Sequence, residues 1–434
     1  MKTKILLLLA VLTIATACSN KEKKQINEDA KHHADWVYDA TIYEVNIRQY
    51  TPEGTFTAFC NHIPRLKELG VDILWFMPIQ PIGKEKMKGT LGSYYSIQNY
   101  TQANPDFGTL DNFKQIVKVA HDNGMKVILD WVANHTSHDA VWTKEHKDWY
   151  ATDSLGNIVS PYDWTDVAKL DYNNKDMREA MKQAMIFWLK ETDIDGFRCD
   201  VAYEVPTDFW ETTAIALKEV KPDIFMLAEA AKPELNQNAF DAYYSWEIHH
   251  KMNDIAKGKA NVDSLRAALK KMADFPEYSI PMQFTSNHDE NSWQGSEFER
   301  MGEAAKTFAA LTYILPGIPL IYSGQEVGFN RRLEFFEKDV IDWDDPNGFT
   351  AFYQSLNKLK KSNKALFCPE LGGNLEEITT DKPEDIFAVR RKVEDNTITA
   401  IFNLSPNSVD VLVNDDNFSE KMHLAGWKYR IVEN

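Results

Sequence analysis

The chain has 434 residues, of which 44% are hydrophobic and 12% aromatic. It can therefore bury a full core in one large domain with a smaller one, or in two or three ordinary domains, and is not a disordered chain. Its formal net charge of −17 argues against nucleic-acid binding, which needs a basic face, and places little constraint on a neutral ligand.

The N-terminal residues are typical of an export signal. Lys2 and Lys4 precede the apolar run ILLLLAVLTIA, and small residues lead into Cys18. The ATAC sequence that ends at Cys18 resembles a bacterial lipobox, which implies cleavage after residues 1–17 and lipidation of Cys18. The alternative is a plain signal with a coincidental cysteine. We expect residues 18–35 to be a tether, and the protein to be an exported lipoprotein of the periplasm, outer membrane or cell surface.

The other cysteines indicate no disulfide framework. Cys60, Cys199 and Cys368 are odd in number and scattered, and the first two lie in apolar patterns typical of buried side chains. No later segment has the roughly 20 apolar residues that a membrane span needs. A lipid on Cys18 would therefore be the only membrane attachment.

After the tether, strand-like and helix-like stretches alternate. Strands are expected near residues 40–47, 71–78, 126–132, 196–201, 224–230, 240–246, 279–287 and 318–324. Helical spacing of apolar residues separates most of them, as in residues 56–70, 109–124, 175–190, 206–220 and 301–315.

This alternation predicts an α/β fold with a closed parallel (β/α)8 TIM barrel, since about eight strand–helix pairs can be counted. An open doubly wound sheet is the structural alternative. No glycine-rich phosphate loop follows the first strand, so the usual reason to prefer that fold is missing.

Three strand-like runs end in a carboxylate: Asp200 in GFRCD, Glu229 in IFMLAEA and Asp289 in FTSNHDE. A fourth run, VILDWVANH, ends in the same strand-to-loop setting. Parallel strands of a barrel bring such ends to one mouth, and glycosidic bond cleavage needs a set of carboxyl groups. In order and spacing, the four segments resemble the four short blocks of the alpha-amylase superfamily (glycoside hydrolase family 13).

The resemblance implies a role for each carboxylate. Asp200 matches the nucleophile, Glu229 the general acid/base, and Asp289 the carboxylate that binds sugar hydroxyls and stabilises the transition state. Arg198 lies on the same side of its strand as Asp200 and is expected to keep it ionised. Glu229 must start protonated, so its pKa should be raised. A retaining mechanism would place the Asp200 and Glu229 carboxyls about 5–5.5 Å apart.

The resemblance also implies substrate-binding residues. His135 and His288 would hydrogen-bond hydroxyls of one glucose ring, and Tyr95 would stack on that ring, with Tyr94 as the alternative. The remaining predicted substrate-site residues are Asp130, Asn134, Arg198 and Glu204. Each residue alone also has a structural interpretation, such as a helix cap or a buried polar pair.

The sequence departs from many alpha-amylases after the nucleophile. VAYEVP follows Asp200 and is similar to the VANEV-type run of neopullulanases and cyclomaltodextrinases, which implies that Glu204 lies near the acceptor subsite. Lys169 stands where calcium-binding relatives carry an aspartate, and an ammonium cannot ligate a hard cation. We expect no calcium at that position, although Asn134 matches a calcium ligand of some members. The chemistry needs no metal or other cofactor.

The resemblance divides the chain into domains. It predicts a catalytic barrel over residues 36–364, interrupted by a short domain B at 136–172, where an ordinary loop would be too long. Short alternating strands predict a C-terminal antiparallel β-sandwich over residues 365–434. Aromatic residues of domain B could extend the sugar platform or pack as a lid: Trp142, Trp149, Tyr150 and Trp164.

The leading hypothesis is a retaining α-glucan hydrolase that cleaves α-1,4-glucosidic bonds of starch or malto-oligosaccharides. A neopullulanase, a cyclomaltodextrinase or a transglycosylating relative would carry the same three carboxylates. A glycan-binding lipoprotein without activity is the alternative of another class, and it predicts loss of at least one carboxylate. None of the three is lost.

Overall fold

The computed structural model describes residues 32–415 and 418–433. The signal segment, Cys18 and most of the tether lie outside these residues, so their assignments stay predictions. His32–Asn434 belong to one compact unit. No helix among the described residues is long and apolar enough to cross a membrane.

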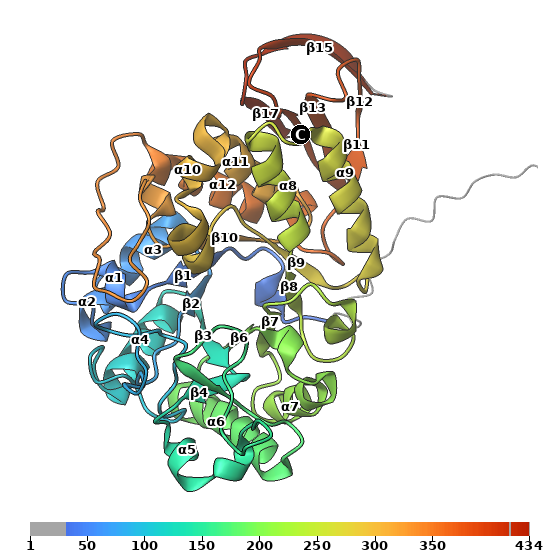
Figure 1. The fold of residues 1–434 in the computed structure, drawn as a ribbon. Helices are drawn as coiled ribbons and strands as arrows, with labels where there is room; N and C mark the ends of the chain where they lie inside the picture. Colours follow the sequence, from blue (N-terminus) through green and yellow to red (C-terminus); the bar gives the residue numbers. More distant parts are fainter. Residues whose placement is uncertain (1–31, 416–417, 434) are drawn as a thin grey trace, which may run out of the picture. The chain divides into compact units, whose positions relative to one another are not determined.

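Eight parallel strands close into a barrel, in the spatial order β1-β10-β9-β8-β7-β6-β3-β2 (Figure 1). This confirms the predicted fold class and excludes an open doubly wound sheet. The barrel strands are β1 (Ile42–Val45), β2 (Ile73–Phe76), β3 (Lys126–Val132), β6 (Gly196–Asp200), β7 (Phe225–Ala228), β8 (Ala242–Tyr244), β9 (Ile280–Gln283) and β10 (Ile318–Tyr322).

Helices connect the barrel strands and cover them on the outside (Figure 1). They are α1 (Ile47–Tyr50), α2 (Phe56–Cys60), α3 (Ile63–Leu69), α4 (Leu110–Asp122), α6 (Lys175–Thr192), α7 (Thr207–Val220), α8 (Trp246–Ala256), α9 (Val262–Lys270), α10 (Glu297–Met301), α11 (Ala305–Ile314) and α12 (Phe349–Ser362). Helix α4 shows how the sequence sets their ends: Thr109 and Asn112 form a capping box, and Gly124 follows its last turn with a positive φ.

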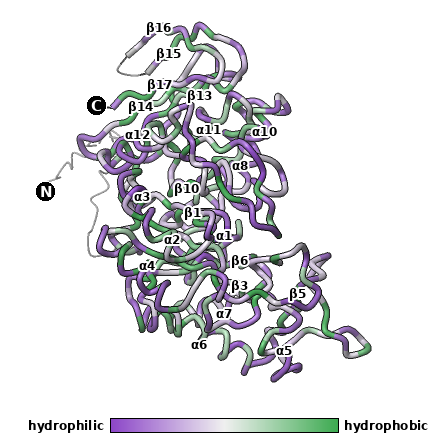
Figure 2. Tube along the Cα trace, turned by 90° about the vertical axis from the view of Figure 1, so that its left-hand side faces the viewer, coloured by the Kyte–Doolittle hydropathy of each residue, from purple (hydrophilic) through white to green (hydrophobic). Residues whose placement is uncertain are grey.

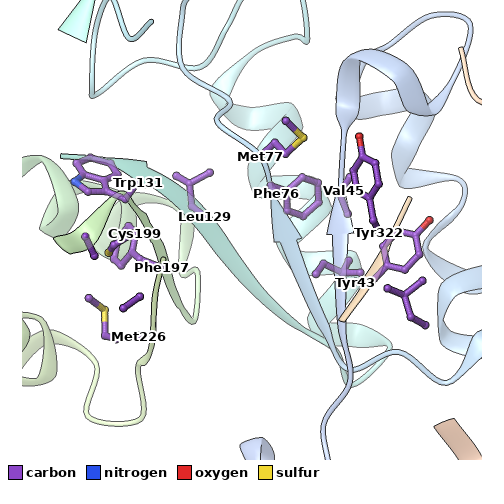
Figure 3. Close-up of a cluster of buried hydrophobic side chains, with 14 of the residues drawn as sticks. Tyr43, Val45, Phe76, Met77, Leu129, Trp131, Phe197, Cys199, Met226 and Tyr322 are labelled. Atoms are coloured by element: carbon purple, nitrogen blue, oxygen red, sulfur yellow. The ribbon is translucent and has the colours of Figure 1, made fainter. Parts of the chain in front are cut away.

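Side chains of the barrel strands alternate between two cores. Tyr43, Phe76, Trp131 and Cys199 belong to the cluster between strands and helices (Figure 3). The alternate residues, such as Trp75, belong to a second cluster inside the barrel. Because a strand has a period of two, Arg198 and Asp200 on either side of Cys199 must face the interior.

The segment between β3 and α6 forms a small irregular layer. It holds β4 (His135–Ser137), which pairs with β5 (Val167–Lys169), and α5 (Val141–Glu145). In the hydropathy-coloured trace, the loops near β5 and α5 are largely hydrophilic and extend beyond β3 and β6 (Figure 2). The start and end of domain B remain a prediction, but the expected long insertion after the third barrel strand is present.

The C-terminal part consists of two antiparallel sheets. One sheet contains β11 (Asn374–Glu377), β13 (Ile386–Val393), β14 (Asn396–Asn403) and β17 (Tyr429–Glu433). The other contains β12 (Thr379–Thr380), β15 (Val409–Asp415) and β16 (Phe418–Leu424). Ile386 and Ile401 of the first sheet share a core with Val411 of the second, as the sandwich prediction requires.

Candidate active site

The three predicted catalytic carboxylates lie at the carboxyl ends of barrel strands. Asp200 is the last residue of β6, Glu229 follows β7 directly, and Asp289 follows β9 by a short segment. The Glu229 amide still donates to the Cys199 carbonyl at 3.0 Å, so the β6–β7 pairing continues to the point where Glu229 emerges. Because the strands are parallel, all three residues reach one mouth.

Arg198 lies at the centre of the site and joins three carboxylates. Its Nη1 lies 2.9 Å from Asp130 Oδ1 and 3.2 Å from Asp200 Oδ1. Its Nη2 lies 3.0 Å from Glu229 Oε2, as an ion pair without hydrogen-bond alignment. The guanidinium is fully buried, and Tyr244 Oη accepts from Nε at 3.1 Å. One fixed cation therefore positions Asp200 and Glu229 together.

Val201 gives a second link between these carboxylates. It follows Asp200 directly, and its backbone N–H donates to Glu229 Oε2 at 2.7 Å. The φ angle of Val201 is +36°, a conformation that a β-branched residue rarely adopts. This strained turn aims the amide of the β6 loop at the side chain that follows β7.

Burial raises the pKa of both Asp200 and Glu229 above the ordinary carboxyl range. The charge of Glu229 raises the pKa of Asp200 further, whereas Arg198 lowers the pKa of both. Arg198 favours the ionised form of Asp200, as predicted, but burial and the neighbouring carboxylates outweigh it, so the net pKa of Asp200 is raised. When Glu229 carries a proton, its repulsion of Asp200 disappears and the attraction by Arg198 remains.

Asp289 has the opposite electrostatic setting. Burial raises its pKa, but His288, Arg198 and Trp293 together lower it more, so the net pKa lies below the ordinary range. His288 Nε2 lies 3.3 Å from Asp289 Oδ2, and the Trp293 indole N–H donates to Asp289 Oδ1 at 3.2 Å. The surroundings of Asp289 therefore favour its carboxylate form, whereas the net pKa values of Asp200 and Glu229 are raised.

Glu44, which no sequence motif indicated, is also part of this site. Glu44 is fully buried in β1, and its Oε1 forms a short hydrogen bond with His288 Nδ1. Burial lowers the pKa of His288, but Asp289 and Glu44 raise it more, so the net pKa lies well above the ordinary value. A signal was present: Glu44 is the only charged residue in the buried strand IYEV.

The structure separates Tyr95 from Tyr94. Tyr95 Oη donates to Asp130 Oδ2 at 3.0 Å and lies 2.7 Å from His288 Nε2. Tyr94 Oη instead donates to Asn46 at 3.0 Å, and the Arg48 guanidinium covers its ring. Tyr95 is therefore the tyrosine that lies among the site residues.

Asp130 and the His135 side of the mouth complete the predicted set. Asp130 is fully buried and also accepts from the Trp75 indole at 3.1 Å. Burial lowers the pKa of His135 to about 4, so its ring is neutral. The Asn134 amide lies 3.3 Å from His135 Nδ1, which matches a bracing role.

Glu204 faces the inserted layer across the mouth. Its Oε2 lies 3.5 Å from Lys169 Nζ, and Tyr162 Oη donates to its Oε1. Lys169 is thus engaged by a carboxylate. Among the described residues, no three His, Cys, Asp or Glu side chains form a group that could hold a metal ion.

The aromatic residues of the insertion do not act as one platform. Trp149 and Tyr150 are buried, and Trp142 is partly buried against Tyr100 at 4.6 Å between ring centroids. Only Trp164 of the four approaches a site residue, with its ring 5.6 Å from that of His135. For the other three, the packing interpretation describes their observed contacts.

Comparison with known proteins gives consistent matches. The model of the alpha-amylase catalytic domain matches residues 24–166 and 149–365. An alpha-amylase of Haloarcula japonica is 25% identical over 87% of this chain, which spans 57% of that protein's length. A cyclomaltodextrinase of a Bacillus species is 27% identical over 85% of this chain and 73% of its own length.

Solved structures agree. An alpha-amylase from Lactobacillus plantarum superimposes with a TM-score of 0.82 at 29% identity, covering 91% of this chain and 99% of that one. A maltogenic alpha-amylase from Thermotoga neapolitana gives a TM-score of 0.81 at 28% identity, covering 91% of this chain and 96% of that one. With the family model matching well over half of its residues, the chain belongs to the alpha-amylase family of glycoside hydrolases.

Proposed function

We propose that this protein is a retaining α-glucan hydrolase that cleaves α-1,4-glucosidic bonds of starch or malto-oligosaccharides. The observation that carries the proposal is the sharing of one buried guanidinium by Asp200 and Glu229, because a retaining mechanism needs two carboxyl groups flanking one glycosidic carbon. Asp289, His288 and Tyr95 surround the same point and supply hydrogen bonds and an aromatic face for the sugar.

The first step forms a covalent intermediate. Glu229 gives its proton to the glycosidic oxygen while the bond between that oxygen and C1 breaks, and an Asp200 carboxylate oxygen bonds to C1. In the second step Glu229 removes a proton from water as the water oxygen bonds to C1. The bond from Asp200 to C1 breaks as the bond to water forms, which restores the Asp200 carboxylate, and the two successive inversions at C1 preserve the anomeric configuration.

A second candidate is a cyclomaltodextrinase, a maltogenic amylase or a transglycosylating relative. Two points favour it: several relatives carry the first two names, and Glu204, which the resemblance places near the acceptor subsite, contacts Lys169 and Tyr162. A carboxylate there can orient an incoming hydroxyl, so it would affect the ratio of transfer to hydrolysis.

Product analysis distinguishes these candidates. The signal-less protein is incubated with soluble starch, maltoheptaose, cyclodextrin and pullulan, and products are followed by chromatography and NMR. Initial release of α-anomers supports a retaining enzyme, whereas β-anomers would contradict it. The ranking of the four substrates decides between amylase and cyclomaltodextrinase. Glucan binding without cleavage would favour a non-catalytic glycan-binding lipoprotein.

We also propose that the protein is exported and anchored through a lipid on Cys18. The proposal rests on Lys2, Lys4, the apolar run and the ATAC sequence, and on no structural observation. Radiolabelled palmitate should enter the wild-type protein and not a Cys18→Ala variant in a bacterial host. If neither protein is labelled and both are found in the soluble fraction, the proposed lipid anchor is contradicted.

A further inference from the structure

Trp293 is an exposed aromatic side chain beside the catalytic residues. It is 50% exposed, in a part of the chain where most large apolar side chains are buried. It lies in the single π-helical turn Glu290–Gln294 that follows Asp289 directly. Turns of this kind are frequent at functional sites.

Aromatic rings form a continuous surface from the site to Trp293. The ring of Tyr95 lies 6.3 Å from that of Phe335, with 13° between their planes. Phe335 lies 5.1 Å from Trp293, and Phe336 lies 5.8 Å from Trp293. Phe335 and Phe336 are partly buried, so Trp293 presents the most accessible face of this surface.

Hydrogen bonds from two sides hold the loop that carries Phe335 and Phe336. The Leu333 amide donates to Asn291 Oδ1 at 2.8 Å, which joins this loop to the turn that carries Trp293. Arg48 Nη1 donates to the Phe335 carbonyl at 3.1 Å, and the Leu91 amide donates to the Phe336 carbonyl at 3.0 Å. The rings are therefore positioned before any ligand arrives, which lowers the entropic cost of binding.

We propose that Trp293, with Phe335 and Phe336, forms a subsite for a further glucose ring of the glucan chain, next to the ring that is cleaved. The apolar face of a pyranose packs well on an aromatic ring, and Trp293 is the half-exposed ring of this group. The proposal rests on the function proposed above and adds a chain-length preference to it: longer malto-oligosaccharides gain a contact that short ones lack.

Trp293 has two separable contacts, which makes the test sharp. Its ring contacts Phe335 and is half exposed, and its indole N–H donates to Asp289 Oδ1 at 3.2 Å. Trp293→Phe keeps an aromatic face and removes the N–H, whereas Trp293→Ala removes both. Ile215→Ala on α7 is a matched control, since Ile215 is also an exposed apolar residue, at 62%, and lies outside the site.

The experiment measures kcat/KM for maltoheptaose and maltotriose with each variant, after circular dichroism has confirmed folding. Trp293→Ala should lower the maltoheptaose-to-maltotriose ratio by about three- to tenfold, while Trp293→Phe and Ile215→Ala keep it near the wild-type value. An unchanged ratio in Trp293→Ala, with active wild-type enzyme, would overturn the subsite. A ratio lowered equally in Trp293→Phe would assign the effect to Asp289 and also overturn it. A wild-type enzyme that cleaves neither substrate would instead contradict the proposed hydrolase.

Discussion

His135 and His288 lie on two sides of one mouth, and both were expected to bind hydroxyls of the same sugar ring. Both are almost fully buried, at 2% exposure. Yet His288 contacts Glu44 and Asp289, and its pKa is raised, whereas His135 contacts the neutral Asn134, and burial lowers its pKa to about 4. Asp289 and Glu44 therefore favour the charged form of the His288 ring, whereas burial favours the neutral form of the His135 ring.

This difference comes from partners on other strands. Glu44 reaches His288 from β1, and no histidine-to-carboxylate bond of this kind reaches His135 among the contacts that the structure describes. A cation beside Asp289 suits a carboxylate that must stay ionised, while a neutral imidazole can both donate and accept with a hydroxyl. Ionisation in this site therefore follows the tertiary neighbours of each histidine.

The largest expected effect comes from replacing Glu229, the assigned general acid/base. Glu229→Gln should lower kcat on maltoheptaose about 10²–10⁴-fold, because the leaving oxygen loses its proton donor. The first step should remain fast with α-maltosyl fluoride, whose leaving group needs no proton. Stopped-flow kinetics with both substrates measures the two cases.

Asp200→Asn is the matched control for that experiment. It should be inactive on both substrates because the nucleophile itself is removed, while oligosaccharide binding by calorimetry and folding stay near wild-type levels. Full activity of Glu229→Gln on maltoheptaose would contradict its assignment as the general acid/base. Full activity of Asp200→Asn on either substrate would contradict its assignment as the nucleophile.

The buried, neutral ring of His135 predicts a pH effect on the stability of the fold. The pKa of His135 is lower in the folded protein than in the unfolded chain, so its contribution is fully present above about pH 6.5 and is lost as the pH falls toward 4. The loss by pH 4 is about 3 kcal/mol in the free energy of unfolding. His135→Asn cannot titrate, so it should lose about that much less between pH 7 and 4 in urea unfolding.

The control for this stability series is His423→Asn, an exposed position on β16. It should follow the wild-type pH dependence. If His135→Asn also follows the wild-type curve, then His135 is not the buried neutral group that the comparison requires.

The contact between Glu44 and His288 predicts a smaller effect, on activity. Glu44→Gln keeps the shape of the side chain and removes its charge, so the pKa of His288 should fall. His288 then loses its proton at lower pH, and the alkaline limb of the kcat/KM profile should move to lower pH. At neutral pH kcat/KM should fall about ten- to a hundredfold, as expected for a hydrogen bond to a charged group.

The pH profile of Glu44→Gln must be interpreted with all groups that face His288. These are Glu44 of β1, Tyr95 of the loop after β2, and Asp289, with Arg198 and Asp130 behind them. When His288 is already replaced in His288→Gln, adding Glu44→Gln should cause no further shift of the alkaline limb. An unchanged alkaline limb in the single variant would mean that Glu44 only fills space in β1.

The sequence alone predicted the barrel and the strand-end carboxylates, because period-two alternation and terminal positions are local patterns. It placed Arg198 on the correct side of its strand for the same reason, and the structure shows Arg198 in contact with Asp200. It did not predict the raised pKa of Asp200, because that depends on burial and on Glu229 from another strand.

Glu44 and Trp293 were missed for the same physical reason. Glu44 contacts His288 only because β1 and the segment after β9 meet in the fold. Trp293 contacts Phe335 only because the loop that carries Phe335 packs against it. Aromatic residues of the insertion looked equally suitable in the sequence, yet packing buries Trp149 and Tyr150. Exposure, which decides between a platform and a core, is a tertiary property.

The smallest expected effect concerns metal on the His135 side of the mouth. Asn134, which matches a calcium ligand of some relatives, already has a protein partner, since its side-chain amide lies beside His135 Nδ1. Lys169 adds a positive charge 3.5 Å from Glu204, which opposes a bound Ca²⁺.

EDTA treatment should therefore leave both kcat/KM and the thermal unfolding midpoint of the signal-less enzyme within experimental error. Lys169→Asp provides the complementary variant, because it removes the ammonium and adds a hard oxygen ligand beside Asn134. If calcium raises the unfolding midpoint of this variant and not of the wild type, Lys169 is what excludes the ion. A loss of activity in the wild type that calcium reverses would contradict this prediction. It would mean that a bound cation organises the His135 side of the mouth, so that both sides would carry a positive charge.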